Sequence, residues 1–179
     1  MIVEFCIESI EGAKAAQNWN ADRIEICSEL AKDGLSPNQD LIKGCIENFK
    51  GDSHVMIRPK AGSFCYSKEE IIQMKKEITA AFHLKAKGVV FGVLNSFKQV
   101  DKPANTLLFN HAKILGLECT FHRAFDQLAD PFNSIEEIIE IGFHTILTSG
   151  QKENAIDGIT TIEKLVEISK GRIEIMAGS

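Results

Sequence analysis

The chain has 179 residues, of which 44% are hydrophobic and 25% are charged, and this is enough apolar material for one core. Its net charge of −5 gives no basic excess for binding nucleic acid, and no apolar stretch reaches the roughly 20 residues that a membrane helix needs. The N-terminus lacks the basic segment of a signal peptide. The expected protein is therefore cytoplasmic and globular, and binds neither nucleic acid nor a membrane.

Short apolar runs alternate with longer segments of helical length along the whole chain. Seven runs have the length and composition of β-strands, at residues 2–7, 23–27, 54–58, 88–93, 119–123, 145–147 and 172–176. Six helices are expected between them. This alternation predicts right-handed β-α-β units that build one parallel sheet.

Four of the expected helices begin with a capping signal. A polar residue is followed either by a proline at the first helical position or, three residues on, by a glutamate that completes a capping box. The proline type occurs at Ser36-Pro37 and Asp130-Pro131, and the capping box begins at Ser67 and at Thr160.

The strands favour a closed barrel over an open sheet. Strands of an open parallel sheet read as continuous apolar runs, because helices cover both faces. Several strands here alternate instead, as where Phe5 and Ile7 oppose Glu4 and Cys6. The apolar face should meet the helices and the mixed face should point into the barrel. The predicted fold class is therefore α/β, a TIM (β/α)8 barrel, with one domain over residues 1–179.

A complete barrel of this kind has eight strands and typically about 250 residues. The seventh predicted strand lies directly before Ser179, so the eighth strand and the last helices are expected to be missing. A barrel truncated after strand seven has two unpaired edges, and such edges favour association with another chain.

Polar residues gather where the predicted strands end, which is the working face of a TIM barrel. The stretch "ECTFHRAFD" places His122 at the end of the fifth strand, with Arg123 and Asp126 in the loop above it. His122 should point into the barrel, and Arg123 can pair with Asp126. The sixth strand runs into Ser149.

These positions support a hypothesis of enzyme activity on a small anionic molecule. Arginine suits carboxylate and phosphate, and Glu25 with His122 can move protons if a substrate lies between them. The catalytic candidates are Glu25, Arg58, His122 and Asp126, and the substrate-binding candidates are Arg123 and Ser149. The alternative is a buried network of ion pairs that only satisfies the barrel interior, formed by Glu4, Arg23, Glu25, Arg58 and Glu174.

Two of the five cysteines, Cys6 and Cys27, lie at the same end of neighbouring strands. Adjacent strands are about 4.8 Å apart, so the two sulfurs can come within bridging distance. Two soft thiolates suit Cu(I), whereas zinc would need His122 and His54 to complete four ligands. The alternative is that both cysteines only fill small spaces at the barrel mouth.

Several motifs resemble the CutC copper homeostasis family over the whole chain. The matching stretches are "EFCIES", "ADRIEICSELAKDGLSP", "HVMIRPKAGSFCYS", "GVVFGVL", "TFHRAFD", "ILTSG" and "GRIEIMAGS". The resemblance implies a cytoplasmic TIM barrel, a homo-oligomer, a role in copper tolerance, and Cu(I) as a cofactor held by Cys6 and Cys27.

The sequence departs from the family at three places. Residues 59–63 lack the Arg-Gly-Gly-Asp that usually follows the proline, so an arginine and a carboxylate are lost. Trp19-Asn20 replaces a glycine pair, and Asn20 is expected to take the left-handed turn. The usual continuation past the seventh strand is absent. Two functions stay open: copper homeostasis through Cu(I) binding by a thiol pair, or a TIM-barrel enzyme acting on a small anionic substrate. Whether the chain is an enzyme is undecided at this point.

Overall fold

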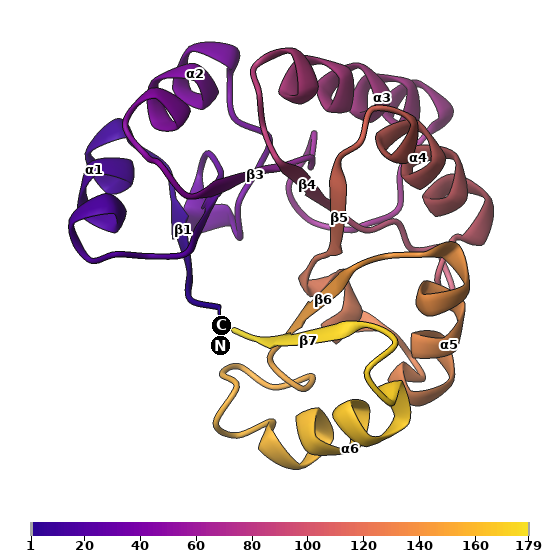
Figure 1. Ribbon diagram of the computed structural model, residues 1–179. Helices are drawn as coiled ribbons and strands as arrows, with labels where there is room; N and C mark the ends of the chain where they lie inside the picture. Colours follow the sequence, from indigo (N-terminus) through magenta and orange to yellow (C-terminus); the bar gives the residue numbers. More distant parts are fainter. Residues whose placement is uncertain (1, 179) are drawn as a thin grey trace. The chain divides into compact units, whose positions relative to one another are not determined.

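The computed structural model describes residues 2–178, in which seven strands alternate with six α-helices (Figure 1). The strands are β1 (Glu4–Ile7), β2 (Arg23–Ile26), β3 (Asp52–Met56), β4 (Gly88–Phe91), β5 (Glu118–Phe121), β6 (Thr145–Thr148) and β7 (Glu174–Ala177). The helices are α1 (Ile10–Asn18), α2 (Gln39–Glu47), α3 (Lys68–His83), α4 (Lys102–Ile114), α5 (Pro131–Ile141) and α6 (Ile159–Ser169). Two short 3-10 helices, η1 (Leu30–Lys32) and η2 (Arg123–Gln127), follow β2 and β5.

The strands form one sheet whose order, β1 to β7, is the order of the chain. The pairs β1–β2, β2–β3, β3–β4, β5–β6 and β6–β7 are parallel. All seven predicted strands overlap an observed strand, so the predicted α/β fold with sequential parallel strands is confirmed. No helix within residues 2–178 is both long enough and apolar enough to cross a membrane.

Two predicted helix starts are confirmed. Asp130 caps α5, and its side chain accepts a hydrogen bond of 3.1 Å from the Asn133 amide, with Pro131 at the first helical position. Helix α3 begins at Lys68, directly after Ser67. Asn20 has a φ of 54°, which is the left-handed turn expected before β2.

The other two predicted starts are wrong. Helix α2 is capped by Asn38 instead of Ser36, and the Asn38 side chain accepts from the Leu41 amide at 2.8 Å. Ser36 is engaged elsewhere, because its hydroxyl donates to Glu77 at 2.7 Å. Helix α6 begins at Ile159, so Thr160 lies inside the helix and cannot cap it.

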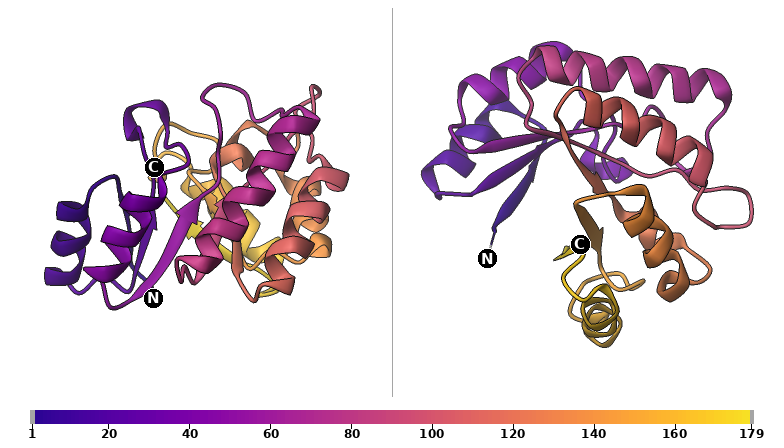
Figure 2. Two further views of the ribbon diagram at one scale, coloured as in Figure 1. Left: turned by 90° about the horizontal axis from the view of Figure 1, so that it is seen from above. Right: turned by 45° about the vertical axis from the view of Figure 1, so that its right-hand side comes forward.

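The described chain packs as two compact units, which are treated separately below. The first comprises residues up to 63, 68–90 and 111–118, and the second comprises 64–67, 91–110 and 119–178. In the first unit, α1 and α2 pack together on one side of β1–β3 (Figures 1 and 2). Its core includes Ile24 and Ile26 of β2, both fully buried. Because the single-domain prediction concerns how the units combine, it stays a prediction.

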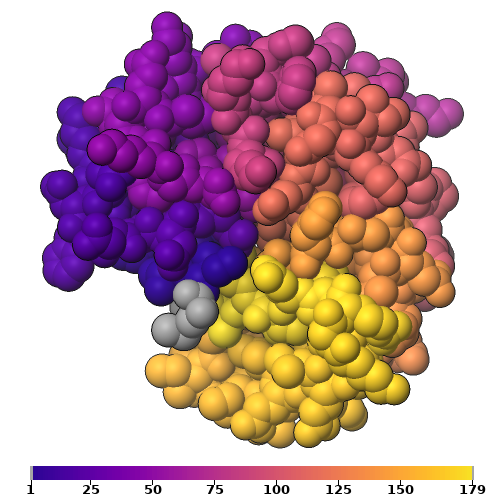
Figure 3. Space-filling view, in the orientation of Figure 1, coloured from indigo at the N-terminus to yellow at the C-terminus, as the bar shows by residue number. Residues whose placement is uncertain are grey.

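The second unit has an aromatic core. Phe143 packs against Phe91, Phe121 and Phe109, with ring centroids 5.0, 5.3 and 5.7 Å apart. Helix α5 packs against α6, and α6 against β7. The yellow C-terminal segment reaches the surface in Figure 3, and Glu174 and Ala177 of β7 are exposed.

Candidate functional site

A pair of thiols and a carboxylate meet where β1 and β2 end. Cys6 of β1 lies opposite Glu25 of β2 in the sheet register, and Cys27 follows β2 directly. The Sγ atoms of Cys6 and Cys27 are 3.5 Å apart, and Cys27 Sγ donates to Glu25 Oε1 at 3.3 Å. The predicted approach of the two sulfurs is therefore confirmed. One ligand atom from each residue falls within 4.8 Å of the others, a spacing that could hold a metal ion.

The three groups differ in their access to water. Cys6 is exposed, whereas Cys27 and Glu25 are buried. Hydrogen-bond contact with the Cys27 sulfur lowers the pKa of Cys6. The same bond, together with burial, raises the pKa of Cys27 well above its ordinary value, and burial raises the pKa of Glu25. Of the two thiols, Cys6 therefore loses its proton more readily than Cys27.

Arg58 lies in the same unit, but its guanidinium is directed at backbone carbonyls. Its Nη1 donates to the carbonyl oxygens of Lys32, Asp33 and Gly34 at 3.0, 2.9 and 3.1 Å. Its Nη2 donates to the carbonyl of Gly62 at 3.2 Å. The side chain is buried, and these bonds tie the loop after β2 to the loop after β3. The catalytic role suggested for Arg58 stays a prediction.

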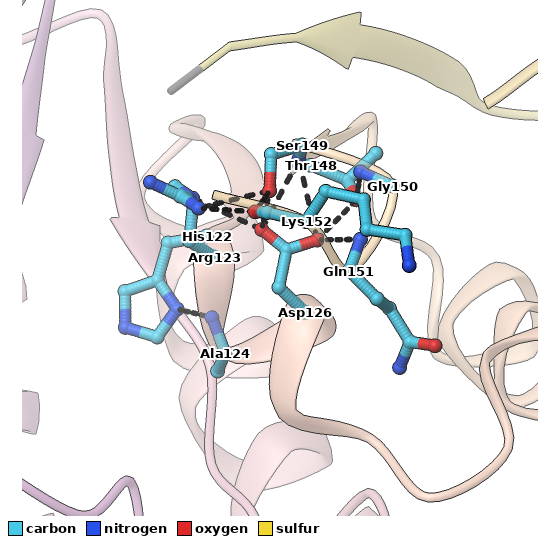
Figure 4. A network of polar contacts seen from close by, with 9 residues as sticks. All are labelled: His122, Arg123, Ala124, Asp126, Thr148, Ser149, Gly150, Gln151 and Lys152. Carbon is cyan, nitrogen blue, oxygen red and sulfur yellow. Dashed lines mark hydrogen bonds and ion pairs between the residues drawn. The ribbon is translucent and has the colours of Figure 1, made fainter. Parts of the chain in front are cut away.

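In the second unit, Arg123 and Asp126 form the predicted pair (Figure 4). Arg123 Nε donates to Asp126 Oδ2 at 2.9 Å, and Arg123 Nη2 donates to Ser149 Oγ at 2.9 Å. Both residues belong to η2, the 3-10 turn that follows β5. The structure thus brings three of the predicted site residues, Arg123, Asp126 and Ser149, into one network.

The Asp126 carboxylate also holds the loop after β6. Its oxygens accept hydrogen bonds from the Thr148 hydroxyl, from the Ser149 amide and hydroxyl, and from the Gln151 amide. Gly150 and Gln151 have φ values of 70° and 62°, so the loop curls around the carboxylate. Thr148 and Gln151 were not among the predicted site residues. The motif "ILTSG" contains Thr148 and could have indicated it, whereas Gln151 lies just outside that motif.

His122 directly follows β5 and is buried. Its Nδ1 accepts a hydrogen bond of 3.3 Å from the Ala124 amide, and its ring lies 4.8 Å from the ring of Phe64. An Nδ1 that accepts carries no proton, so the ring is neutral and its one proton is on Nε2. Since His122 and Glu25 belong to different units, their acid–base pairing stays a prediction.

Comparison with known proteins decides the family. A family model, described as the CutC family, matches residues 1–179. The chain belongs to the CutC family. A CutC family protein of Glaesserella parasuis is 43% identical over 178 residues, which are 99% of this chain and 72% of that protein. The human protein named "Copper homeostasis protein cutC homolog" is 39% identical over 177 residues, which are 99% of this chain and 64% of the human protein.

Solved structures support the same family and fold. The crystal structure of CutC from Streptococcus agalactiae matches with a TM-score of 0.90 and 33% identity, over 98% of this chain and 86% of that one. An aldolase, QR15, matches with a TM-score of 0.72 but 15% identity, which shows the fold alone. The TIM-barrel class predicted for this CutC family member is therefore confirmed.

Proposed function

We propose that this CutC family member is a cytoplasmic copper homeostasis protein that binds Cu(I) as its cargo through Cys6 and Cys27. The observation that carries the proposal is the separation of 3.5 Å between the two sulfurs. Thiolates are the soft ligands that Cu(I) prefers. The lowered pKa of Cys6 makes a thiolate available without a large free-energy cost.

The spacing of the two sulfurs allows one metal ion to bind both of them. With metal–sulfur bonds of about 2.3 Å, the zinc–thiolate length, two sulfurs 3.5 Å apart subtend about 100° at the metal. That angle leaves room for a third ligand, and the Glu25 carboxylate belongs to the same group. A structural zinc site takes four ligands, whereas this group offers three. The donor set thus fits Cu(I) better than structural zinc.

The difference in exposure gives the ion a route. Because Cys6 is exposed and Cys27 is buried, an incoming ion meets Cys6 first and Cys27 second. Binding at Cys27 then releases its proton, so copper uptake should be accompanied by proton release.

The experiment is a competition between reduced protein and a Cu(I) chelator of known affinity. The parent chain is expected to bind one Cu(I) per chain. The variants Cys6→Ser and Cys27→Ser should each lose at least tenfold in affinity, and Cys65→Ser, which alters a cysteine outside the pair, should not. Equal affinity of parent and Cys6→Ser/Cys27→Ser double variant would end the proposal.

A second candidate function is an enzyme acting on a small anionic substrate, and Arg123 is the observation that favours it. Its side chain is 37% exposed, while Asp126 and Ser149 fix its Nε and Nη2. A guanidinium oriented in this way is suited to a carboxylate or phosphate group. In this function Arg123 binds the anion, Asp126 and Ser149 position it, and Glu25, Arg58 and His122 are the remaining catalytic candidates.

A thermal-shift screen of small carboxylates and phosphates tests this second function. A substrate or product should raise the midpoint of unfolding of the parent chain, and Arg123→Gln should lose the shift. Lys164→Gln, which removes a cation lying over the Phe132 ring, is the matched control. A ligand that stabilises Arg123→Gln as much as the parent would argue against an anion site at Arg123.

A further inference from the structure

The Cys27 sulfur lies directly beneath the loop that follows β2, defined here as residues 28–36 and called the β2 loop. A Cβ atom added to Gly34 would lie 3.3 Å from Cys27 Sγ, so the backbone of this loop passes against the sulfur. Leu30 packs on the buried cluster of Cys27, Met56 and Val90. The β2 loop is therefore part of the reason that Cys27 has no exposed surface.

The β2 loop holds two non-glycine residues in the left-handed region. Glu29 and Asp33 have φ values of 49° and 63°. Non-glycine residues in the left-handed region are strained, and they persist only when surrounding groups hold them. Two backbone hydrogen bonds between Ser28 and Leu35 close the base of the loop, and contacts with other segments hold its remaining residues in place.

Arg58 supplies the largest set of those contacts. As described above, its Nη1 donates to three consecutive carbonyls of the loop, at Lys32, Asp33 and Gly34. The backbone adds two more bonds: the Arg58 amide donates to Ser36 Oγ at 2.7 Å, and the Ser36 amide donates to the Arg58 carbonyl at 2.9 Å. The three converging carbonyl dipoles also stabilise the buried positive charge.

A weaker contact holds the other end of the loop. Glu8, which directly follows β1, accepts a hydrogen bond of 2.8 Å from the Leu30 amide. Glu8 is exposed, so water competes for this bond more than for those of Arg58.

We infer that Arg58 is a positioning residue that holds the β2 loop closed over Cys27 and so controls access to the buried half of the thiol pair. Its guanidinium acts on the carbonyls of the loop and through them on Cys27. The consequence for copper rests on the proposed function: a closed loop should slow the release of an ion held by Cys27, with exchange directed through the exposed Cys6.

The test is the alkylation rate of Cys27, measured without copper by site-resolved mass spectrometry with iodoacetamide and a phosphine reductant. The full chain carries Cys6→Ser, so that a modified Cys6 cannot shield Cys27. In this background, Arg58→Met keeps the aliphatic part of the side chain but removes the guanidinium. It should raise the alkylation rate of Cys27 at least tenfold. Arg58→Lys should give an intermediate rate, because an ammonium group has three donors for the three carbonyls.

Cys45 on α2 and Cys119 on β5 are buried controls within the same molecule. Their alkylation rates should stay unchanged in Arg58→Met, since only the β2 loop opens. An unchanged Cys27 rate would overturn the inference. So would a rise at Cys45 by the same factor, because Arg58 would then stabilise the whole unit.

A second variant covers the case in which Arg58→Met does not fold. Glu8→Ala removes only the bond to the Leu30 amide and should raise the Cys27 rate a few-fold, while Glu8→Gln, which keeps an acceptor, should not. Equal Cys27 rates in Glu8→Ala and the parent would contradict the inference. Because no copper is present, this result is independent of whether the chain binds copper.

Discussion

Cys6 and Cys27 are residues of the same type, but one is exposed to water and the other is buried. Cys6 is exposed and its contact with Cys27 lowers its pKa, whereas Cys27 is buried and its pKa is raised. The alternation of residues along β1 and β2 was enough to predict that the two sulfurs meet. It could not predict the difference in exposure, because the β2 loop that covers Cys27 is held by Arg58 through backbone carbonyls. Every residue has a backbone carbonyl, so a sequence does not show which carbonyls accept a hydrogen bond.

The first prediction concerns the pH dependence of cysteine alkylation. Because the pKa of Cys6 is lowered from 9.0, its rate should reach half of its maximum at a pH below 9. Burial raises the pKa of Cys45 to about 11, so Cys45 should stay protonated and unreactive up to pH 9. Removing the contact between the two sulfurs with Cys27→Ala should move the Cys6 profile to higher pH. An identical Cys6 profile in parent and Cys27→Ala would refute this role for the hydrogen bond.

At the scale of elements, helix starts show where sequence signals succeed and fail. Asp130 caps α5 as predicted, because its side chain has a local amide to accept from. Ser36 has the same kind of signal, but its hydroxyl bonds to Glu77 and to the Arg58 amide instead. Those partners are distant in the sequence, so a local pattern cannot reveal that they take the hydroxyl away from the helix.

The second prediction concerns Asp126, which joins η2 to the loop after β6. Its side chain is 9% exposed and pairs with Arg123, and it accepts from Thr148 at the end of β6 and from two residues of the loop. Asp126→Ala should lower the free energy of unfolding by about 3 kcal/mol, since the hydrogen bonds of a nearly buried carboxylate are lost. Chemical denaturation measures this change.

The matched control is Asp157→Ala. Asp157 is exposed and accepts a bond from the Asn154 side chain at 2.7 Å. Asp157→Ala should lower the free energy of unfolding by less than about 1 kcal/mol. Equal losses in the two variants would mean that Asp126 does not anchor the loop.

At the scale of the whole molecule, the fold class followed from features that recur along the entire chain. Seven strand-like runs separated by helical segments leave few arrangements other than sequential parallel strands. The match to a CutC crystal structure, with a TM-score of 0.90, bears this out. The pairing of Arg123 with Asp126 was predicted, but the hydrogen bonds from the loop after β6 to Asp126 could not be predicted in the same way. They depend on a loop with two left-handed residues, Gly150 and Gln151, and only the glycine is typical of that conformation.

The third prediction concerns self-association, which we propose on the basis of the edge of the sheet. Strand β7 ends the described sheet, and Ala177 on it is exposed. A strand at an edge can pair with another chain, and a lysine there opposes such pairing. The parent is therefore expected to sediment as a homo-oligomer, and Ala177→Lys should shift it toward the monomer. Ala61→Lys, at an exposed loop position, should have no effect. A parent that sediments as a monomer at all concentrations would refute the proposal.

The central claim is that Cys6 and Cys27 together hold Cu(I), and X-ray absorption of the copper-loaded chain tests it most directly. The spectrum should be that of Cu(I) with at least two sulfur neighbours, at about 2.3 Å if they follow the zinc–thiolate length. Cys65→Ser should leave the spectrum unchanged, and Cys27→Ser should remove one sulfur neighbour. A spectrum fitted by nitrogen and oxygen neighbours alone, or one that Cys27→Ser leaves unaltered, would contradict the claim.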